Sequence, residues 1–166
     1  PAAASAGSTR QCVAAVVDGP LVVAGWVGDS RAYWIPDDGD AHQLSVDDSW
    51  AQEMIAQGVP RAQAETSPQA HAITRWLGPD APDPVARTAA TLPDRDGWLL
   101  VCSDGLWNYC SPAADLAALV RSTQDRVGDD PQVLAGALVD WASAEGGRAR
   151  IAAPRARVCG GGSAGR

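Results

Sequence analysis

The first part of the chain alternates short apolar runs with turn-forming residues. Residues 11–17 and 21–27 are apolar and rich in β-branched side chains, and the turn formers at 18–20 separate them. This pattern predicts a β-hairpin. A third apolar run at 31–35 follows the polar turn at 28–30. Three strands in succession predict an antiparallel meander.

A helix is predicted after these strands. Asp47, Asp48 and Ser49 offer side-chain oxygens that can cap a helix over residues 50–57, and Gly58 can end it. Capping is therefore the role we expect for the two aspartates, and no chemistry is assigned to them.

The middle of the chain carries weaker signals. Residues 59–84 are rich in Pro, Gln, Ala and Asp, which predicts a mostly irregular segment. A turn signal at 94–97 precedes the continuous apolar run 98–102. That run has the length of a buried strand.

Two further helices are marked by strong start signals. Ser111 with Pro112, and Asp130 with Pro131, each place a capping side chain before proline at the first helical position. The glycines at 146–147 can end the last helix. Its apolar residues recur at helical spacing: Val133, Leu134, Ala137, Leu138 and Trp141. Strands followed by helices predict a layered α+β fold.

Composition narrows the function classes. The formal charge of -7 disfavours nucleic acid as a partner, because phosphate backbones require clustered cations. The chain has no apolar run of membrane-spanning length and no signal-peptide pattern at its start, so a soluble, cytoplasmic location without a membrane partner is expected. Four cysteines form no CxxC pair, which disfavours a zinc site.

The tryptophans are expected to pack in the core. Six of them fall on predicted strands and helices or at their ends: 26, 34, 50, 98, 107 and 141.

Two aspartates are the candidates for chemistry. Asp29 in WVGDSRAY and Asp104 in LLVCSDGLWNY each follow an apolar strand. A carboxylate held at a strand end suits hard cations such as Mg²⁺ and Mn²⁺. The same dipeptides are also common in turns, and spacing alone leaves both interpretations open. His42 and His71 have no partner at an informative spacing, so no nucleophilic triad is predicted.

Five segments occur in the order seen in a known family. They are GSTR with the hairpin, WVGDSRAYWI, LSVDDSW, HAITRWLG and WLLVCSDGLWNY, within residues 6–147. In this combination the chain resembles the metal-dependent serine/threonine protein phosphatases of the PPM (2C) type, in a bacterial form. The resemblance implies a central β-sandwich flanked by helices in αββα layers. It also implies a Mg²⁺ or Mn²⁺ centre with Asp104 as a ligand, and Asp29 as ligand of an additional metal position.

The chain also departs from the family pattern. It contains no DGxGG motif, so the resemblance implies a domain whose N-terminal strands and bridging aspartate are missing. The family's Asp-Asn pair after the double glycine is replaced by the sequence from Arg148 onward. We therefore expect a partial phosphatase domain over 1–147. Residues 148–166 hold five arginines and no acid, which indicates either a basic, disordered tail or a frameshifted end.

Three functions remain open from the sequence. The first is a phosphatase fragment that acts on phosphoserine and phosphothreonine proteins, opposite a cognate bacterial serine/threonine kinase. The second is a catalytically inactive remnant or regulatory pseudophosphatase module, because ligands are absent at both ends. The third is an unrelated α/β binding domain.

Overall fold

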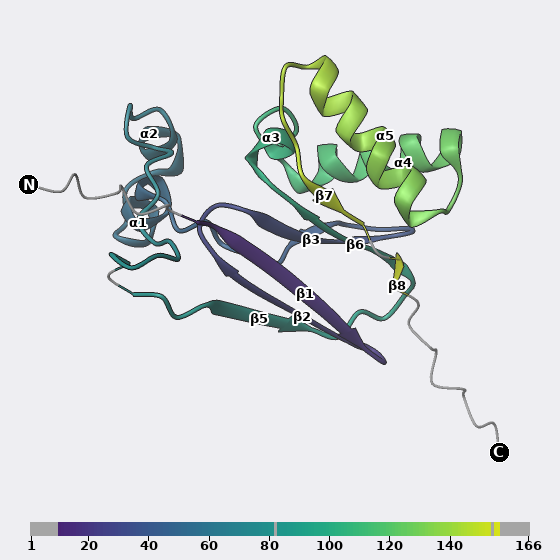
Figure 1. The fold of residues 1–166 in the computed structure, drawn as a ribbon, viewed down its shortest axis with the longest axis horizontal. Helices are drawn as coiled ribbons and strands as arrows, with labels where there is room; N and C mark the ends of the chain where they lie inside the picture. The colour runs from purple at the N-terminus through teal and green to yellow at the C-terminus, as the bar shows by residue number, and fades with distance from the viewer. Residues whose placement is uncertain (1–9, 82, 154, 157–166) are drawn as a thin grey trace, which may run out of the picture.

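Two antiparallel sheets and a layer of helices make up the chain (Figure 1). The computed structural model describes residues 10–81, 83–153 and 155–156. The first sheet has the order β1-β2-β5: β1 (Cys12–Asp18), β2 (Leu21–Val27) and β5 (Arg87–Thr91). The second sheet has the order β4-β3-β6-β7, with β8 also paired to β6: β3 (Arg31–Pro36), β4 (His42–Gln43), β6 (Gly97–Cys102), β7 (Ile151–Ala152) and β8 (Arg155–Ala156).

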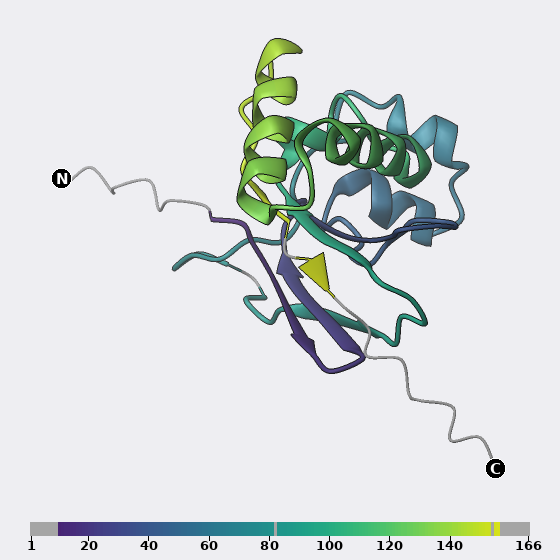
Figure 2. The same cartoon turned by 90° about the vertical axis from the view of Figure 1, so that its right-hand side faces the viewer.

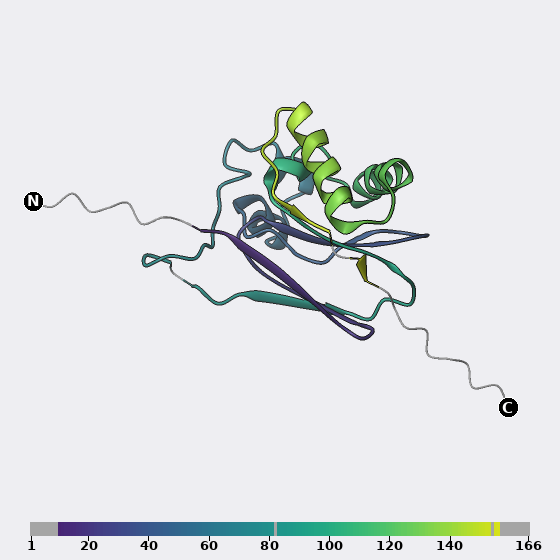
Figure 3. The ribbon, with the colours of Figure 1, turned by 45° about the vertical axis from the view of Figure 1, so that its right-hand side comes forward.

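The helices lie on one side of this sandwich and at one end of it. The elements are α1 (Trp50–Ala56), α2 (Arg61–Glu65), α3 (Asp104–Trp107), α4 (Ala113–Val127) and α5 (Pro131–Ala144). Figures 1 and 2 show α4 and α5 over the outer face of the β3–β6 sheet, with α1 and α2 at the end of the sandwich. Within the described residues, no helix covers the outer face of the β1-β2-β5 sheet (Figure 3). The α+β sandwich is confirmed, with one helical layer.

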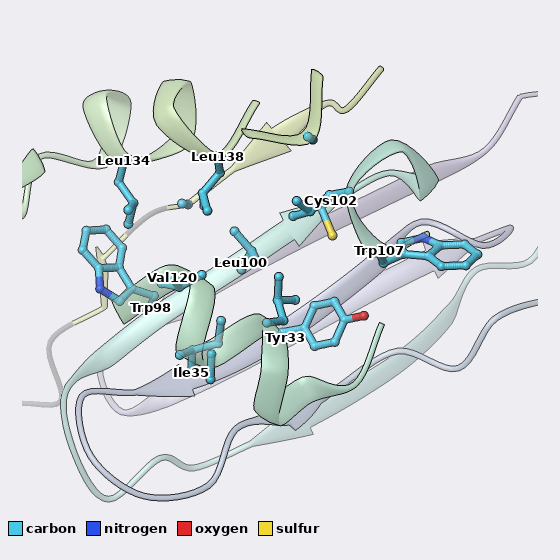
Figure 4. Packing of buried hydrophobic residues seen from close by; sticks show 14 residues of the cluster. Tyr33, Ile35, Trp98, Leu100, Cys102, Trp107, Val120, Leu134 and Leu138 are labelled. Atoms are coloured by element: carbon cyan, nitrogen blue, oxygen red, sulfur yellow. The ribbon is translucent and has the colours of Figure 1, made fainter. Parts of the chain in front are cut away.

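The main core lies between the second sheet and the helices (Figure 4). Trp98, Leu100 and Cys102 of β6 point toward α4 and α5, because side chains alternate along a strand. The intervening Leu99 packs with Val22 of the other sheet. Because β3 and β6 are covered on both faces, nearly every residue in them is buried.

The hairpin is confirmed, but the meander is wrong. β1 and β2 pair from Cys12↔Val27 to Asp18↔Leu21. β3 instead crosses to the second sheet and pairs with β6. Gly28 makes the crossing possible: its φ is +108°, and a Cβ there would lie 2.6 Å from Gln11 Cγ.

The capping predictions gave mixed results. Ser49 caps α1 as predicted, accepting a hydrogen bond from the Gln52 N–H, and Asp130 caps α5. Ser111 does not cap α4, which has no side-chain cap. Its hydroxyl instead accepts a hydrogen bond from Arg31, 3.0 Å away.

Several elements without strong local signals were not predicted. These include β4, β5, α2 and α3; the other described residues within 59–84 are irregular, as expected. The tryptophan prediction is confirmed for Trp26, Trp34, Trp98 and Trp107, which are buried. No helix in the described ranges is long and apolar enough to cross a membrane.

The end of the chain is described in part. Residues 151–152 and 155–156 pair with β6, at its end and at its start respectively. The boundary at residue 147 remains a prediction. The described residues do not include 157–166, and therefore Cys159, or Gly7 to Thr9 of the GSTR segment.

Candidate functional site

Asp104 stands at the first turn of α3, directly after β6. The chain leaves the sheet at Cys102, and Ser103 takes the N-cap position. Ser103 is joined to the segment after α5 by two hydrogen bonds: its N–H donates to the Arg150 carbonyl, and its hydroxyl accepts from the Arg150 N–H, both at 3.0 Å. The Asp104 side chain is exposed. The end of β6 and the segment after α5 together fix the backbone that carries Asp104.

Glycine allows the return segment to approach α3 closely. A Cβ at Gly105 would lie 2.4 Å from the carbonyl carbon of Arg148, and one at Gly147 would meet the Gly105 carbonyl oxygen. Backbone atoms cannot move aside as a flexible side chain can. These two positions therefore require glycine, and they bring the residues after α5 beside Asp104.

Asp29 lies in the crossing from β2 to β3. The indole N–H of Trp107 donates to its carbonyl oxygen at 3.0 Å, which ties the crossing to α3. Its carboxylate is buried, and Oδ1 has no hydrogen-bond partner among the described residues. An unpaired buried carboxylate is unfavourable unless something else compensates its charge.

Asp29 and Asp104 act on each other electrostatically. The pKa of Asp29 is raised from 3.8 to about 6, first by burial and then by the negative charges of Asp104 and Asp47. The structure thus brings together the two aspartates that the sequence singled out. Their role as metal ligands remains a prediction.

The neighbouring Asp47 has a different role from the capping expected of it. Arg31 holds its carboxylate through Nε, at 2.9 Å, and Nη2, at 2.6 Å. The guanidinium of Arg31 also stacks on Trp107, with 3.7 Å to the ring centroid. Asp47 is therefore part of a buried ion pair.

Asp48 also stabilises the crossing instead of capping a helix. Its fully buried carboxylate accepts a hydrogen bond from the Gly28 N–H at 3.0 Å, and its own N–H donates to the Gly28 carbonyl at 2.9 Å. Oδ1 lies 2.8 Å from Arg87 Nε and 3.5 Å from Arg75 Nη1. The arginine partners are distant in sequence, so no local pattern indicated this arrangement.

A groove of about 950 Å³ opens beside Asp104. One wall is formed by residues 10–13 at the start of β1, and the other by the end of β6 with residues 148 and 150–152. Ser30 lines it, whereas its neighbour Asp29 does not. Asp104 therefore lines the groove, and its charge also acts on the buried Asp29 carboxylate. Sequence reasoning did not find the arginines at 10, 148 and 150 that also line it.

The oxygen donors fit a hard cation in part. Asp29 and Asp104 offer carboxylate oxygens, and the orphaned Oδ1 of Asp29 is an available ligand atom. Within the described ranges, no group of three or more His, Cys, Asp or Glu residues could hold a metal ion. This part of the chain supplies a partial donor set.

Similar proteins identify the family. No protein-family model matches the chain. The serine/threonine phosphatase stp of Listeria innocua is 32% identical over 111 residues, which cover 66% of this chain and 43% of that protein. The crystal structure of the PPM Ser-Thr phosphatase MsPP from Mycobacterium smegmatis is 33% identical, with a TM-score of 0.58, over 89% of this chain and 61% of that one. The chain belongs to the PPM-type serine/threonine phosphatase family.

A third comparison extends the structural match. The catalytic domain of the serine/threonine protein phosphatase PstP, solved in complex with two manganese ions, matches with a TM-score of 0.57 over 90% of this PPM-type chain. It is 23% identical, so this match concerns the fold. The chain spans 43% of the curated relative and about 60% of the two solved chains, which are covered to 61% and 59%.

Proposed function

We propose that this chain is part of a metal-dependent protein phosphatase that hydrolyses phosphoserine and phosphothreonine. The observation that supports this most is that the charge of Asp104, which lines an open groove, acts on the buried carboxylate of Asp29, and neither carboxylate forms an ion pair with an arginine among the described residues. Family membership supplies the reaction class. Its substrates are then phosphoproteins, with a bacterial serine/threonine kinase as the opposing enzyme.

The metal in this proposal is Mn²⁺ or Mg²⁺, with Asp104 and Asp29 as the ligands from this chain. Such an ion lowers the pKa of a bound water and neutralises charge on a phosphoryl group. The chain's own contribution is to hold the two carboxylates. Ser103 fixes the start of α3, and the Trp107 indole fixes the backbone of Asp29.

A non-catalytic, regulatory module is the second candidate. The observation favouring it is the absence of a cluster of three metal-binding side chains among the described residues. A partial donor set binds a metal more weakly than a complete one, which would leave the fold without turnover. A cytoplasmic location remains a prediction from the sequence under either function.

Hydrolysis of a phosphothreonine peptide by the purified chain tests the proposal. We expect phosphate release with Mn²⁺, none with EDTA, and a loss of at least about tenfold in Asp104→Asn, because that variant removes one charged ligand. Asp125→Asn, an exposed position on α4, is the matched control and should keep full activity. A folded chain with no Mn²⁺-dependent turnover would contradict hydrolysis and favour the regulatory module.

A further inference from the structure

The groove beside Asp104 is basic in an acidic chain. Arg10, Arg148 and Arg150 line it, and Asp104 is the one acidic residue among its described lining residues. The whole chain carries a formal charge of -7. Three cations in one concave region therefore reverse the local sign of charge. Such a region attracts anions.

These three arginines differ from most others in the structure. Arg31, Arg75 and Arg87 are each held by a buried aspartate. The side chains of the groove arginines make no hydrogen bond or ion pair among the described residues. All three are exposed. Their guanidinium groups are therefore available to a ligand.

The backbone holds the two walls of the groove in place. On one side, Arg10 exchanges two hydrogen bonds with Leu77, at 3.0 and 2.7 Å. On the other, Arg150 exchanges two with Ser103. The tight packing of Gly105 against Arg148 fixes the same wall. Preorganised walls reduce the ordering entropy that a ligand must overcome.

We propose that the groove binds the phosphoryl group of a phosphorylated peptide through Arg10, Arg148 and Arg150, without a metal ion. Guanidinium groups recognise phosphoryl oxygens in a bidentate geometry, which makes arginine the preferred residue for such a ligand. The choice of a phosphopeptide rests on the proposed function. The anion-binding chemistry rests on the groove alone.

The shape of the groove suits an extended peptide. Its volume of about 950 Å³ lies within the range of small-ligand sites. β1 forms one wall and is an edge strand of its sheet, so its outer backbone groups have no strand partner among the described elements. An extended segment can pair with such an edge while arginines hold its phosphate.

Peptide binding in EDTA tests this proposal separately from catalysis. A fluorescein-labelled phosphothreonine peptide is titrated with the chain at low salt, and anisotropy gives Kd. We expect the unphosphorylated peptide to bind at least about tenfold more weakly, and binding to weaken with salt because the contacts are ionic. The double variant Arg148→Gln/Arg150→Gln should weaken phosphopeptide binding at least about tenfold. Arg10→Gln on the opposite wall should weaken it as well.

Arg126→Gln is the matched control. Arg126 is an exposed residue near the end of α4, so the change removes a positive charge away from the groove. Equal losses in Arg126→Gln and the groove variants would overturn the proposal. Equal affinity for the unphosphorylated peptide, or for inorganic phosphate as a competitor, would overturn the phosphopeptide assignment.

The outcomes separate this inference from the proposed function. Phosphopeptide binding in EDTA without Mn²⁺-dependent hydrolysis would support the groove and contradict the phosphatase. Hydrolysis without binding in EDTA would support the phosphatase and overturn metal-independent recognition. Circular dichroism of each variant confirms that loss of binding does not come from unfolding.

Discussion

Two neighbouring groups of aspartates differ in whether arginines pair with them. Just before α1, the buried Asp47 and Asp48 are each held by arginines. Beside them, Asp29 is buried without a partner for Oδ1, and Asp104 is exposed. Buried charges that serve the fold are normally paired, whereas unpaired ones concentrate at ligand sites. The difference separates residues that hold the fold from residues left for a ligand.

The largest effect is expected from breaking the paired group. Asp47→Ala leaves Arg31 buried without its carboxylate, which should lower the free energy of unfolding by about 3–5 kcal/mol. Urea unfolding followed by circular dichroism measures the change. Glu65→Ala, which removes an exposed ion pair with Arg61, is the control and should cost less than about 1 kcal/mol. Equal losses would show that the buried pair has no special structural role.

Removing the charge of Asp29, which has no arginine partner, should instead raise the free energy of unfolding. Asp29 has a pKa raised to about 6 in the folded chain, so between about pH 4 and 6 the folded state holds a proton that the unfolded state has lost. The free energy of unfolding therefore falls as pH rises through this window. Asparagine does not ionise, so Asp29→Asn avoids this fall in stability. In EDTA at pH 7.5 the variant should be more stable than the wild type by on the order of 2 kcal/mol.

The pH dependence provides the control for that variant. The difference in unfolding free energy between Asp29→Asn and the wild type should shrink as the pH is lowered toward 4, because the wild-type carboxyl becomes neutral there. A variant that is less stable than the wild type at pH 7.5 would place Asp29 among the structural charges.

The smallest effect is expected from chemical modification of the two cysteines that line the groove. Modifying the exposed one should leave the fold unchanged. Cys12 is exposed, whereas Cys102 is buried, and burial raises the pKa of Cys102 to about 12. Iodoacetamide at pH 8 should therefore modify Cys12 and leave Cys102 unmodified, because the thiolate is the reactive form. Peptide mapping by mass spectrometry reads both sites. Rapid labelling of Cys102 would show that the groove opens into the core.

Local signals predicted the local parts of the fold. The hairpin, the Ser49 cap and the Asp130–Pro131 start depend on residues near one another in sequence, and all three are confirmed. The pairing of β3 with β6 joins Arg31 to Cys102, which no local pattern can indicate. β5 was missed because RTAAT contains no apolar run.

The candidate site divides in the same way. Asp29 and Asp104 were found because each follows an apolar strand, a feature visible in the sequence. The role of Asp47 could not be predicted, since its partner Arg31 lies 16 residues earlier. Arg148 and Arg150 appeared in the sequence as an unusual composition near the end of the chain. Their place beside Asp104 depends on the close approach of Gly147 to Gly105.

Binding of Mn²⁺, followed by electron paramagnetic resonance at pH 7.5, tests most directly whether Asp29 and Asp104 form one ligand site. We expect saturable binding to the wild-type chain and to the control Asp125→Asn. Asp104→Asn and Asp29→Asn should each lose it, because each removes one of two carboxylates. Unchanged binding in both site variants would contradict the assignment of these aspartates as a metal site.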